Sequence, residues 1–524
     1  MSPLLKRVFY TLSILCILPS GIIAQTTLPH IQWAKSFGGS DVDQAYCIEQ
    51  TSDGGFIVAG SSSSDDQDVV GHHGTTDNSD CWIIKLDGSG NLVWQQSIGS
   101  TSYDFAGAIK EIPEGYIVAG TTGSLGHDVN YLILKLDENG KIIWQRTFGG
   151  SLEDGTGSIE LTSDGGYVIA GGASSNNGDV TGHHGSTDSS DYWVVKVDRN
   201  GTLLWEKSYG GSGDDVAYQI KQTPDHGFII GGWSNSTNGD VTGNHGGQDF
   251  WIVKIDSIGK LKWQKSLGGS VNDDAFSIDV TRDSGYIVTG FSNSNDGNVS
   301  GNHGSTDMWV VRLDSVGNLQ WQKSLGGSDA DVGYSVKSTF DGGCVIAGIT
   351  ASTDGDISLN QGGNDYWIVK LDSVGKLEWQ KTVGGPGEDF ALSIIQSSDS
   401  GYAVAGSADF NGGDINDNHG HEDFWIVKLG TSVTSDVATS SIRRKTINYP
   451  NPFTEKTTIV FNKALESNSS FILFNMLGQE LRNVNIPAGS ESLTLDRNGL
   501  ESGVYVYRVI CNGKVEADGN IVVE

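Results

Sequence analysis

The chain has 524 residues, too many for one ordinary hydrophobic core, so several domains or a repeat architecture are expected. Its 73 glycines, 9 prolines and 47 Trp, Tyr and Phe residues favour short strands joined by tight turns, and a hydrophobic content of 37% argues against wholesale disorder. The formal net charge of −31 argues against nucleic acid and anionic membrane surfaces as partners, because an acidic surface repels phosphate.

Residues 1–24 are predicted to be an export signal. Lys6 and Arg7 precede an apolar run, and Ala24 is the small residue expected before the cleavage point, which leaves Gln25 as the first mature residue. A membrane anchor is the competing interpretation, but the run is broken at Pro19 and is shorter than the roughly 20 residues that a spanning helix needs. We therefore expect an exported mature chain without a transmembrane segment.

Residues 25–429 repeat one pattern seven times. Each unit holds four candidate strands of the types AFSIDV, GYIVTG, DYWIVKLD and LEWQKS, joined by a TSDGG turn, a long loop and a DSVG turn. The alternation and the Gly-marked turns are typical of antiparallel hairpins. The repeat is marked by Trp33, Trp94, Trp144, Trp205, Trp263, Trp321 and Trp379, with a period that settles at 58 residues.

The two ends of the repeat region favour a β-propeller over an open solenoid. The region begins with a lone Trp33 strand and ends after Phe424–Leu429 with no Trp strand following. The first segment can supply the strand that the last unit lacks, which closes the ring and leaves no exposed edge. We predict an all-β protein built on a seven-bladed β-propeller with N-terminal strand closure. Its long loops lie on one face, which is notched where the second unit keeps only Ser124–Asn130.

The composition changes after Leu429. Residues 430–446 are a Ser/Thr-rich linker, and residues 447–524 are predicted to form a small antiparallel, Ig-like β-sandwich with a proline-stiffened entry and glycine-marked hairpins. The motif positions of this unit are Tyr449, Pro450, Asn451, Pro452, Phe453, Gly478, Gly503 and Tyr505.

The segments YPNPF, LFNMLGQE and SGVYVYRV occur in that order in residues 447–524. They closely resemble the type A C-terminal sorting domain of the type IX secretion system of Bacteroidota. The resemblance implies transport across the inner and outer membranes, recognition by the secretion translocon, and commonly removal of the domain with attachment to surface lipopolysaccharide. The chain ends in Glu524, where many members end in basic residues. The repeat region resembles propellers of secreted proteins of the same bacteria, which implies a location and no chemistry.

One aspartate recurs at each crossing between units, five residues after the first glycine of the crossing. A buried carboxylate there would accept backbone N–H bonds and hold the turn, whereas seven carboxylates around a channel mouth would hold a cation. A feature that recurs in every unit favours the structural interpretation. The set is Asp43, Asp104, Asp154, Asp215, Asp273, Asp331 and Asp389; a second set before the aromatic pair is Asp80, Asp191, Asp249, Asp307, Asp365 and Asp423, with Asn130 in the second unit.

The long loops are the candidate metal sites. They carry closely spaced oxygen donors around glycine, as Ca²⁺ prefers, but no EF-hand pattern, and Asx turns explain the same residues. Zn²⁺ would need three or four converging ligands, and most of the loop histidines recur in one GNHG or GHHG turn. The candidates are Asp296, Asp354, Asp356, Asp414, His419 and His421.

An enzyme needs a set of catalytic residues that occurs once and not in every repeat, and the sequence offers none, since no Gly-x-Ser-x-Gly elbow, HExxH or phosphate loop occurs. The repeat tryptophans are interpreted as packing residues, whereas Trp233 occurs once and is the candidate for stacking on a sugar. The leading hypothesis is a non-catalytic binding or adhesion protein, secreted or on the cell surface, that presents its long-loop face to a glycan, a protein or Ca²⁺. The alternative is a glycan-active hydrolase that uses acidic residues on that face.

Overall fold

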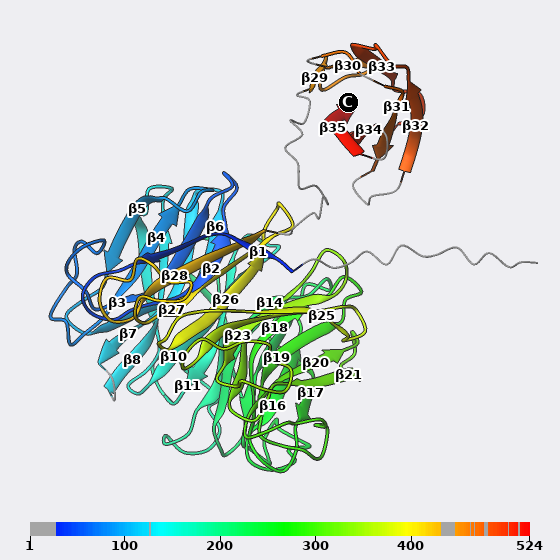
Figure 1. Cartoon of the computed structure of the whole chain (residues 1–524). Helices are drawn as coiled ribbons and strands as arrows, with labels where there is room; N and C mark the ends of the chain where they lie inside the picture. Colours follow the sequence, from blue (N-terminus) through cyan, green and yellow to red (C-terminus); the bar gives the residue numbers. More distant parts are fainter. Residues whose placement is uncertain are drawn as a thin grey trace, which may run out of the picture. The chain divides into compact units, whose positions relative to one another are not determined.

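A computed structural model describes residues 28–124, 127–430, 446–461, 463–465, 467–475, 480–500, 502–511 and 514–523 (Figure 1). The chain forms two compact units, Met1–Val433 and Thr434–Glu524, which we describe separately. The predicted export signal and nearly all of the predicted linker lie outside the described residues. No helix within these ranges is long and apolar enough to cross a membrane.

The first unit consists of antiparallel four-stranded sheets. The sheets contain β2 (Asp43–Gln50), β3 (Phe56–Ser62), β4 (Asp80–Leu86) and β5 (Leu92–Ile98); β6 (Tyr103–Ile112), β7 (Gly115–Ser124), β8 (His127–Leu136) and β9 (Ile142–Phe148); β10 (Asp154–Leu161), β11 (Tyr167–Ala173), β12 (Asp191–Val197) and β13 (Leu203–Tyr209); β14 (Asp215–Gln222), β15 (Phe228–Ser234), β16 (Asp249–Ile255) and β17 (Leu261–Leu267); β18 (Asp273–Val280), β19 (Tyr286–Ser292), β20 (Asp307–Leu313) and β21 (Leu319–Leu325); β22 (Asp331–Ser338), β23 (Cys344–Thr350), β24 (Asp365–Leu371) and β25 (Leu377–Val383); and β26 (Asp389–Gln396), β27 (Tyr402–Ala408), β28 (Asp423–Gly430) and β1 (His30–Phe37). The all-β prediction is confirmed, and four-stranded antiparallel sheets are what propeller blades require.

The TSDGG turn between the first two strands of a sheet is held by an ion pair. In the first sheet Gly54 has a φ of 84°, which favours glycine, and Asp53 accepts hydrogen bonds from Thr51 Oγ1 at 2.5 Å and from the Gly55 N–H at 2.9 Å. Lys85, on the third strand, reaches the same carboxylate at 2.9 Å. Each sheet repeats this pair with one basic residue of its third strand: Lys85, Lys135, Lys196, Lys254, Arg312, Lys370 and Lys428.

Neighbouring sheets pack through aromatic residues of their third strands. Tyr131 of one sheet lies 4.6 Å, between ring centroids, from Trp193 of the next, and its hydroxyl donates a hydrogen bond to the Trp193 carbonyl at 3.0 Å. Tyr192 repeats both contacts with Trp251. Because β3 and β4 and their counterparts are covered on both faces by neighbouring sheets, nearly all of their residues are buried.

The first and last strands of the repeat region meet. β1 pairs antiparallel with β28, and Ser36 lies opposite Trp425 in the register. The sheet that contains this pair packs on the sheet of β2–β5, where Phe424 lies 4.5 Å from Trp82. Hydrogen bonds cross the same boundary, because the Ser393 hydroxyl accepts the Ile48 N–H at 3.2 Å. The first sheet along the chain is thereby a neighbour of the last.

The second unit contains two sheets around one core. β30 (Lys456–Phe461) lies between β29 (Thr446–Tyr449) and β33 (Ser492–Asp496) in the first sheet. The second sheet has the order β32-β31-β34-β35, with β31 (Ser469–Phe474), β32 (Glu480–Ile486), β34 (Gly503–Cys511) and β35 (Lys514–Val523). Buried side chains of both sheets, among them Ile459 and Tyr507, belong to one hydrophobic cluster.

Removing β1 is predicted to destabilise the whole first unit. A mature chain that begins at Gly38 leaves β28 with an unpaired edge, and each lost ladder hydrogen bond contributes about 0.5–1.5 kcal/mol. We expect the free energy of unfolding, measured by urea titration with near-UV circular dichroism, to fall by more than about 3 kcal/mol. The control is a chain that begins at Leu28, which keeps β1. An unchanged urea midpoint in the shorter chain would contradict this prediction.

Candidate functional site

The innermost strands of the sheets line a cavity of about 500 Å³, which we call the inner cavity. In each sheet, the residue three positions after the crossing aspartate lies on the wall of this cavity. Phe276 lies 5.0 Å from Tyr218 and 5.2 Å from Tyr334, between ring centroids, so these three form an aromatic wall. The full set at this position is Tyr46, Gly107, Gly157, Tyr218, Phe276, Tyr334 and Leu392. Their differences make the cavity asymmetric, although the sheets that surround it are alike.

A second position, six residues after each crossing aspartate, carries charges. Around the inner strands the signs alternate, in the order Glu49, Lys110, Glu160, Lys221, Asp279, Lys337 and Ile395. Lys110 forms an ion pair with Glu49, and Lys221 lies 2.8 Å from Glu160. All four side chains are at most a quarter exposed, so their attraction is stronger than that of surface pairs.

A second cavity of about 410 Å³, the outer cavity, shares two of its lining residues with the inner one. These are Tyr46 and Phe105, whose rings meet edge to face at 5.9 Å. The rest of its lining is rich in hydroxyl groups, including Ser79 and Thr121. It includes Gly123 and Val129 on either side of the shortened loop of the second sheet, so the predicted notch adjoins this cavity.

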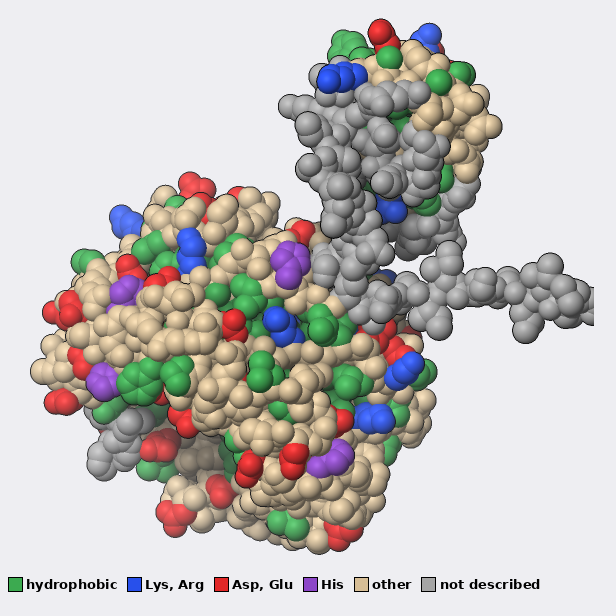
Figure 2. Space-filling view, viewed as in Figure 1, with side chains coloured by type: hydrophobic (Ala, Val, Ile, Leu, Met, Phe, Trp, Pro, Cys, Tyr) green, Lys and Arg blue, Asp and Glu red, His purple; other side chains and the backbone are tan. Residues whose placement is uncertain are grey.

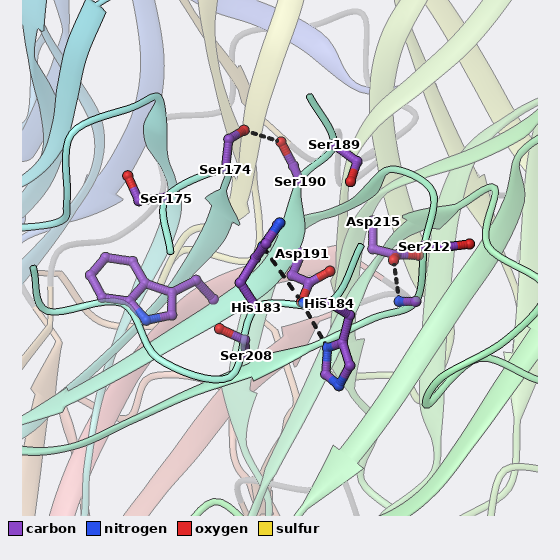
Figure 3. A network of polar contacts seen from close by, with 12 residues as sticks. Ser174, Ser175, His183, His184, Ser189, Ser190, Asp191, Ser208, Ser212 and Asp215 are labelled. Atoms are coloured by element: carbon purple, nitrogen blue, oxygen red, sulfur yellow. Dashed lines mark hydrogen bonds and ion pairs between the residues drawn. The ribbon is translucent and has the colours of Figure 1, made fainter. Parts of the chain in front are cut away.

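The crossing aspartates are fully buried and bind the turns. Asp43 Oδ2 accepts the Gly39 N–H at 2.7 Å and the Ser64 hydroxyl at 2.9 Å. A Cβ on Gly38 would lie 2.5 Å from Asp43 Oδ2 and 2.4 Å from Asp423 Oδ1, so only glycine fits there. Two buried carboxyl groups therefore flank the crossing. Figure 3 shows an equivalent crossing, with Asp191 and Asp215.

Burial shifts the titration of these carboxyl groups. The pKa of Asp43 and of Asp389 is raised to about 7, chiefly by burial. The neighbouring carboxylates, Asp423 and Asp365, contribute to this rise. The pKa of Asp215 and of Asp365 is raised to about 6, again chiefly by burial. Several aspartates of the second set, the one before the aromatic pair, lie beside a histidine ring. In Figure 3, His184 Nδ1 lies 2.8 Å from Asp191 Oδ2.

The predicted metal-binding residues hold the loops in this structure. Asp296 and Asp354 each accept a backbone N–H of a crossing at 2.7 Å, and His419 Nδ1 lies 2.8 Å from Asp423 Oδ2. Asp356 and Asp414 accept crossing N–H groups at 3.2 and 3.3 Å, and the His421 carbonyl accepts the Asn418 amide. Across the described ranges no three His, Cys, Asp or Glu side chains converge as a metal site would require.

Trp233 is half-buried on β15, the strand that pairs with the one carrying Tyr218. Burial raises the pKa of Tyr218, and a side-chain hydrogen bond with Trp233 offsets part of that shift. Sequence reasoning selected this tryptophan because it occurs once, and missed Tyr218 and its neighbours because they alternate like ordinary strand residues. A comparison of the repeats would have revealed that the two inner positions vary, while the aspartate at the start of each inner strand does not.

Comparison with known proteins decides the nature of the second unit. Residues 448–524 match the family model described as the secretion system C-terminal sorting domain. This part of the chain is a secretion sorting domain. The resemblance inferred from YPNPF, LFNMLGQE and SGVYVYRV is thus confirmed, and the sorting domain indicates export to the cell surface or into the medium through the type IX machinery.

The first unit is less well connected to known proteins. A stretch of 155 residues is 25% identical to the regulatory protein FlaEY of Caulobacter vibrioides, covering 28% of this chain and 16% of that protein. The chain thus spans about a sixth of that relative. Among solved structures, a fungal alcohol oxidase in complex with copper is 12% identical, with a TM-score of 0.45 over 95% of this chain and 100% of that one. Puromycin hydrolase is 12% identical, with a TM-score of 0.44 over 82% of this chain and 60% of its own. These similarities carry no inference about activity.

The opening motif of the sorting domain is fixed to its last strand. The Phe453 N–H donates to the Val522 carbonyl at 2.9 Å, and Asn451 Oδ1 accepts the Val522 N–H at 2.7 Å. Phe453 and Tyr505 are buried, whereas Tyr449 is 79% exposed. The bonds that precede Pro450 and Pro452 are cis. Gly503 begins β34 and is exposed, and Gly478 lies outside the described residues.

The buried aspartates are predicted to make the protein more stable in mild acid. The folded-state pKa of Asp365, about 6, exceeds the ordinary value of 3.8, so the folded state holds a proton that the unfolded state releases. The free energy of unfolding therefore falls as pH rises from about 4 to about 6, and the loss is complete above that range. Asp365→Asn removes the charge, as Asn130 does in the second sheet, and should add about 1–3 kcal/mol at pH 8. Urea titrations at pH 5 and pH 8 measure this.

The matched control is Asp188→Asn, an exposed loop carboxylate whose replacement should leave the pH dependence unchanged. A D365N variant with the wild-type slope between pH 5 and pH 8 would show that this carboxyl group titrates normally in the folded protein.

Proposed function

We propose that this chain is an exported, non-catalytic binding protein, whose first unit is a seven-bladed β-propeller and whose β-sandwich sorting domain delivers it to the cell surface or the medium. The observation that carries the proposal is the contrast between the two kinds of polar residue in the first unit. Those that recur in every sheet hold turns and crossings, whereas the residues that differ between sheets gather at the inner and outer cavities. Asymmetry at a cavity favours recognition of a ligand.

The propeller assignment is supported by the order of contacts between sheets. Each inner strand packs on the sheet that precedes it, from β3 with β6 to β23 with β26, and β27 packs on β2. Hydrogen bonds follow the same order near the cavity, because the Ser277 hydroxyl accepts the Val336 N–H at 3.0 Å and the Ser335 hydroxyl accepts the Ile394 N–H at 3.2 Å. We place the propeller at residues 25–429, the linker at 430–446 and the sandwich at 447–524.

The ligand site is proposed to be the pair of cavities and the notched rim beside them. Tyr46 and Phe105 lie between the two cavities, and the hydroxyl groups of the outer cavity surround them. Apolar walls with a few polar groups suit a ring-shaped ligand such as a sugar unit of a glycan, or a side chain of a surface protein. Calcium in the long loops remains a separate proposal, to be tested by the change in thermal stability on adding Ca²⁺.

A hydrolase is the second candidate, and one residue favours it. Asp274 is buried, its Oδ1 has no hydrogen-bond partner, and burial together with Asp273 raises its pKa to about 7. A carboxyl group that stays protonated near neutral pH can act as a general acid in glycoside hydrolysis. The other sheets place Gln, Phe, Gly or Val at this position, so the acid is not part of the repeat.

Binding and hydrolysis are separated by one experiment on the mature full chain. We expect glycans or surface proteins to be retained without turnover, and Phe105→Ala to weaken retention at least ten-fold because it removes a wall shared by both cavities. Phe340→Ala, at a turn where the ring is 54% exposed, is the control. If the wild-type chain releases hydrolysis products from a glycan and Asp274→Asn abolishes that release, the protein is a hydrolase and the binding proposal is wrong.

Delivery is tested by removing residues 447–524 in a cell that carries a type IX system. We expect the shortened protein to remain in the periplasm, as measured by immunolabelling of intact cells and fractionation, because the translocon no longer has a sorting domain to recognise. Full-length F105A serves as the control and should be exported. Normal export of the shortened chain would contradict the delivery role.

A further inference from the structure

Lys337 is the cation of the inner cavity that has no direct partner. Its side chain is half-buried on β22, and its ammonium makes no hydrogen bond or ion pair with any residue that the structure describes. Lys110 and Lys221, the other two lysines at this position, each bind a glutamate. Asp279 acts on Lys337 from a longer distance and accepts the Ser338 N–H at 2.8 Å.

The position that follows Lys337 breaks the alternation of charge. After the lysine on β22, the next strand, β26, would carry a carboxylate if the alternation continued, but the residue there is Ile395. The neighbouring strands are nevertheless in contact, since the Ser335 hydroxyl of β22 accepts the Ile394 N–H of β26. On this side, where the following inner strand gives Lys110 a glutamate and Lys221 an aspartate, Lys337 has only the apolar Ile395, which lines the same cavity. On its other side Asp279 accepts a backbone N–H and forms no direct ion pair with the ammonium.

Three lysines line the inner cavity, although the chain as a whole carries a formal charge of −31. Two of them are in ion pairs with glutamates, which leaves Lys337 as the lysine available to a ligand. On the visible face of the first unit, red acidic side chains are scattered widely and basic ones are few (Figure 2). Burial lowers the pKa of Lys337 to about 8, and Lys221 adds to the effect, while Asp279 offsets part of it from a distance. An anion in the cavity would offset the remaining cost of burying this cation.

We propose that the inner cavity binds the carboxylate of a ring-shaped acid, with the carboxylate on Lys337 beside Ile395 and the ring against Phe276 and Tyr334. The aromatic wall begins three residues before Lys337 in the same strand, so a ligand held by the ammonium can also reach the rings of Tyr334 and Phe276, whose centroids are 5.2 Å apart. A volume of about 500 Å³ accommodates such a molecule. This proposal deepens the proposed binding function and rests on it.

Two sources share this chemistry, namely an aromatic acid and a sugar acid at the end of a glycan. The probes are benzoate and D-glucuronate, each compared with its uncharged counterpart, benzamide and methyl glucoside, by isothermal titration calorimetry on the mature full chain. We expect one of the two acids to bind at least ten-fold more tightly than its uncharged counterpart, and the acid that binds identifies the source. Equal affinity for acid and counterpart, or no binding of either acid, would overturn the proposal.

Two substitutions test the residues. Lys337→Met keeps the length of the side chain and removes the charge, and Ile395→Glu supplies a fixed carboxylate in place of the ligand. Each is expected to weaken acid binding at least ten-fold. Lys323→Met, at an exposed position of the outer strand β21, is the control and should retain wild-type affinity. Wild-type affinity in folded K337M or I395E would refute the site.

The outcomes separate this site from the proposed function. If K337M does not fold, as judged by circular dichroism, I395E carries the test, because it keeps Lys337 and supplies the carboxylate that would otherwise come from the ligand. Retention of a glycan or protein partner that depends on Phe105 but is unchanged in K337M would leave the binding function standing and refute the carboxylate site. The expected result is that the wild type binds the acid and retains the partner, and that F105A and K337M each lose both activities.

Discussion

The structure of the first unit depends on the pairing of β1 with β28. These strands are separated by most of the chain, and their ladder joins the two ends of the repeat region. Apart from the contacts between the first and the last sheet, the main contacts between sheets link sheets that follow one another along the chain, so they can form locally as the chain folds. The contact between Phe424 and Trp82 and the hydrogen bond between Ser393 and Ile48 exist only when the ends have met. The shape of the inner cavity follows from that closure, because its wall needs every inner strand in place.

The residues that recur in every sheet differ from those that line the inner cavity. The basic residue of each third strand binds the turn of its own sheet, and the crossing aspartates bind backbone N–H groups of the crossing. Such groups are unavailable to a ligand because their hydrogen bonds are already made inside the protein. The inner positions are under no such demand. Tyr218, Phe276 and Lys337 can therefore differ from their counterparts in other sheets without cost to the fold.

Much of the fold follows from the sequence, and much of the candidate site does not. Period-two alternation, Gly-marked turns and the tryptophan repeat predict the strands, and the segments around Phe453 and Tyr505 predict the sorting domain that the comparison confirms. The inner cavity escapes prediction because Tyr334 and Lys337 look like ordinary alternating strand residues until the strands are arranged around a common space. Trp233 shows the same limit, since its single occurrence marked it as a candidate for stacking on a sugar, and only the structure places it on the strand beside that of Tyr218. The histidine-rich loops drew attention by composition, although their hydrogen bonds serve the crossings.

The number of sheets has a consequence for charge. In the proposed seven-bladed propeller the inner strands form a ring of seven positions, and positive and negative groups can alternate completely around a ring only when the number of positions is even. Two like charges must then be adjacent, or one place must be neutral. The chain uses Ile395 for the neutral place, and this leaves Lys337 without the second neighbour that every other cation has. In that arrangement the odd number of blades accounts for the neutral position beside Lys337.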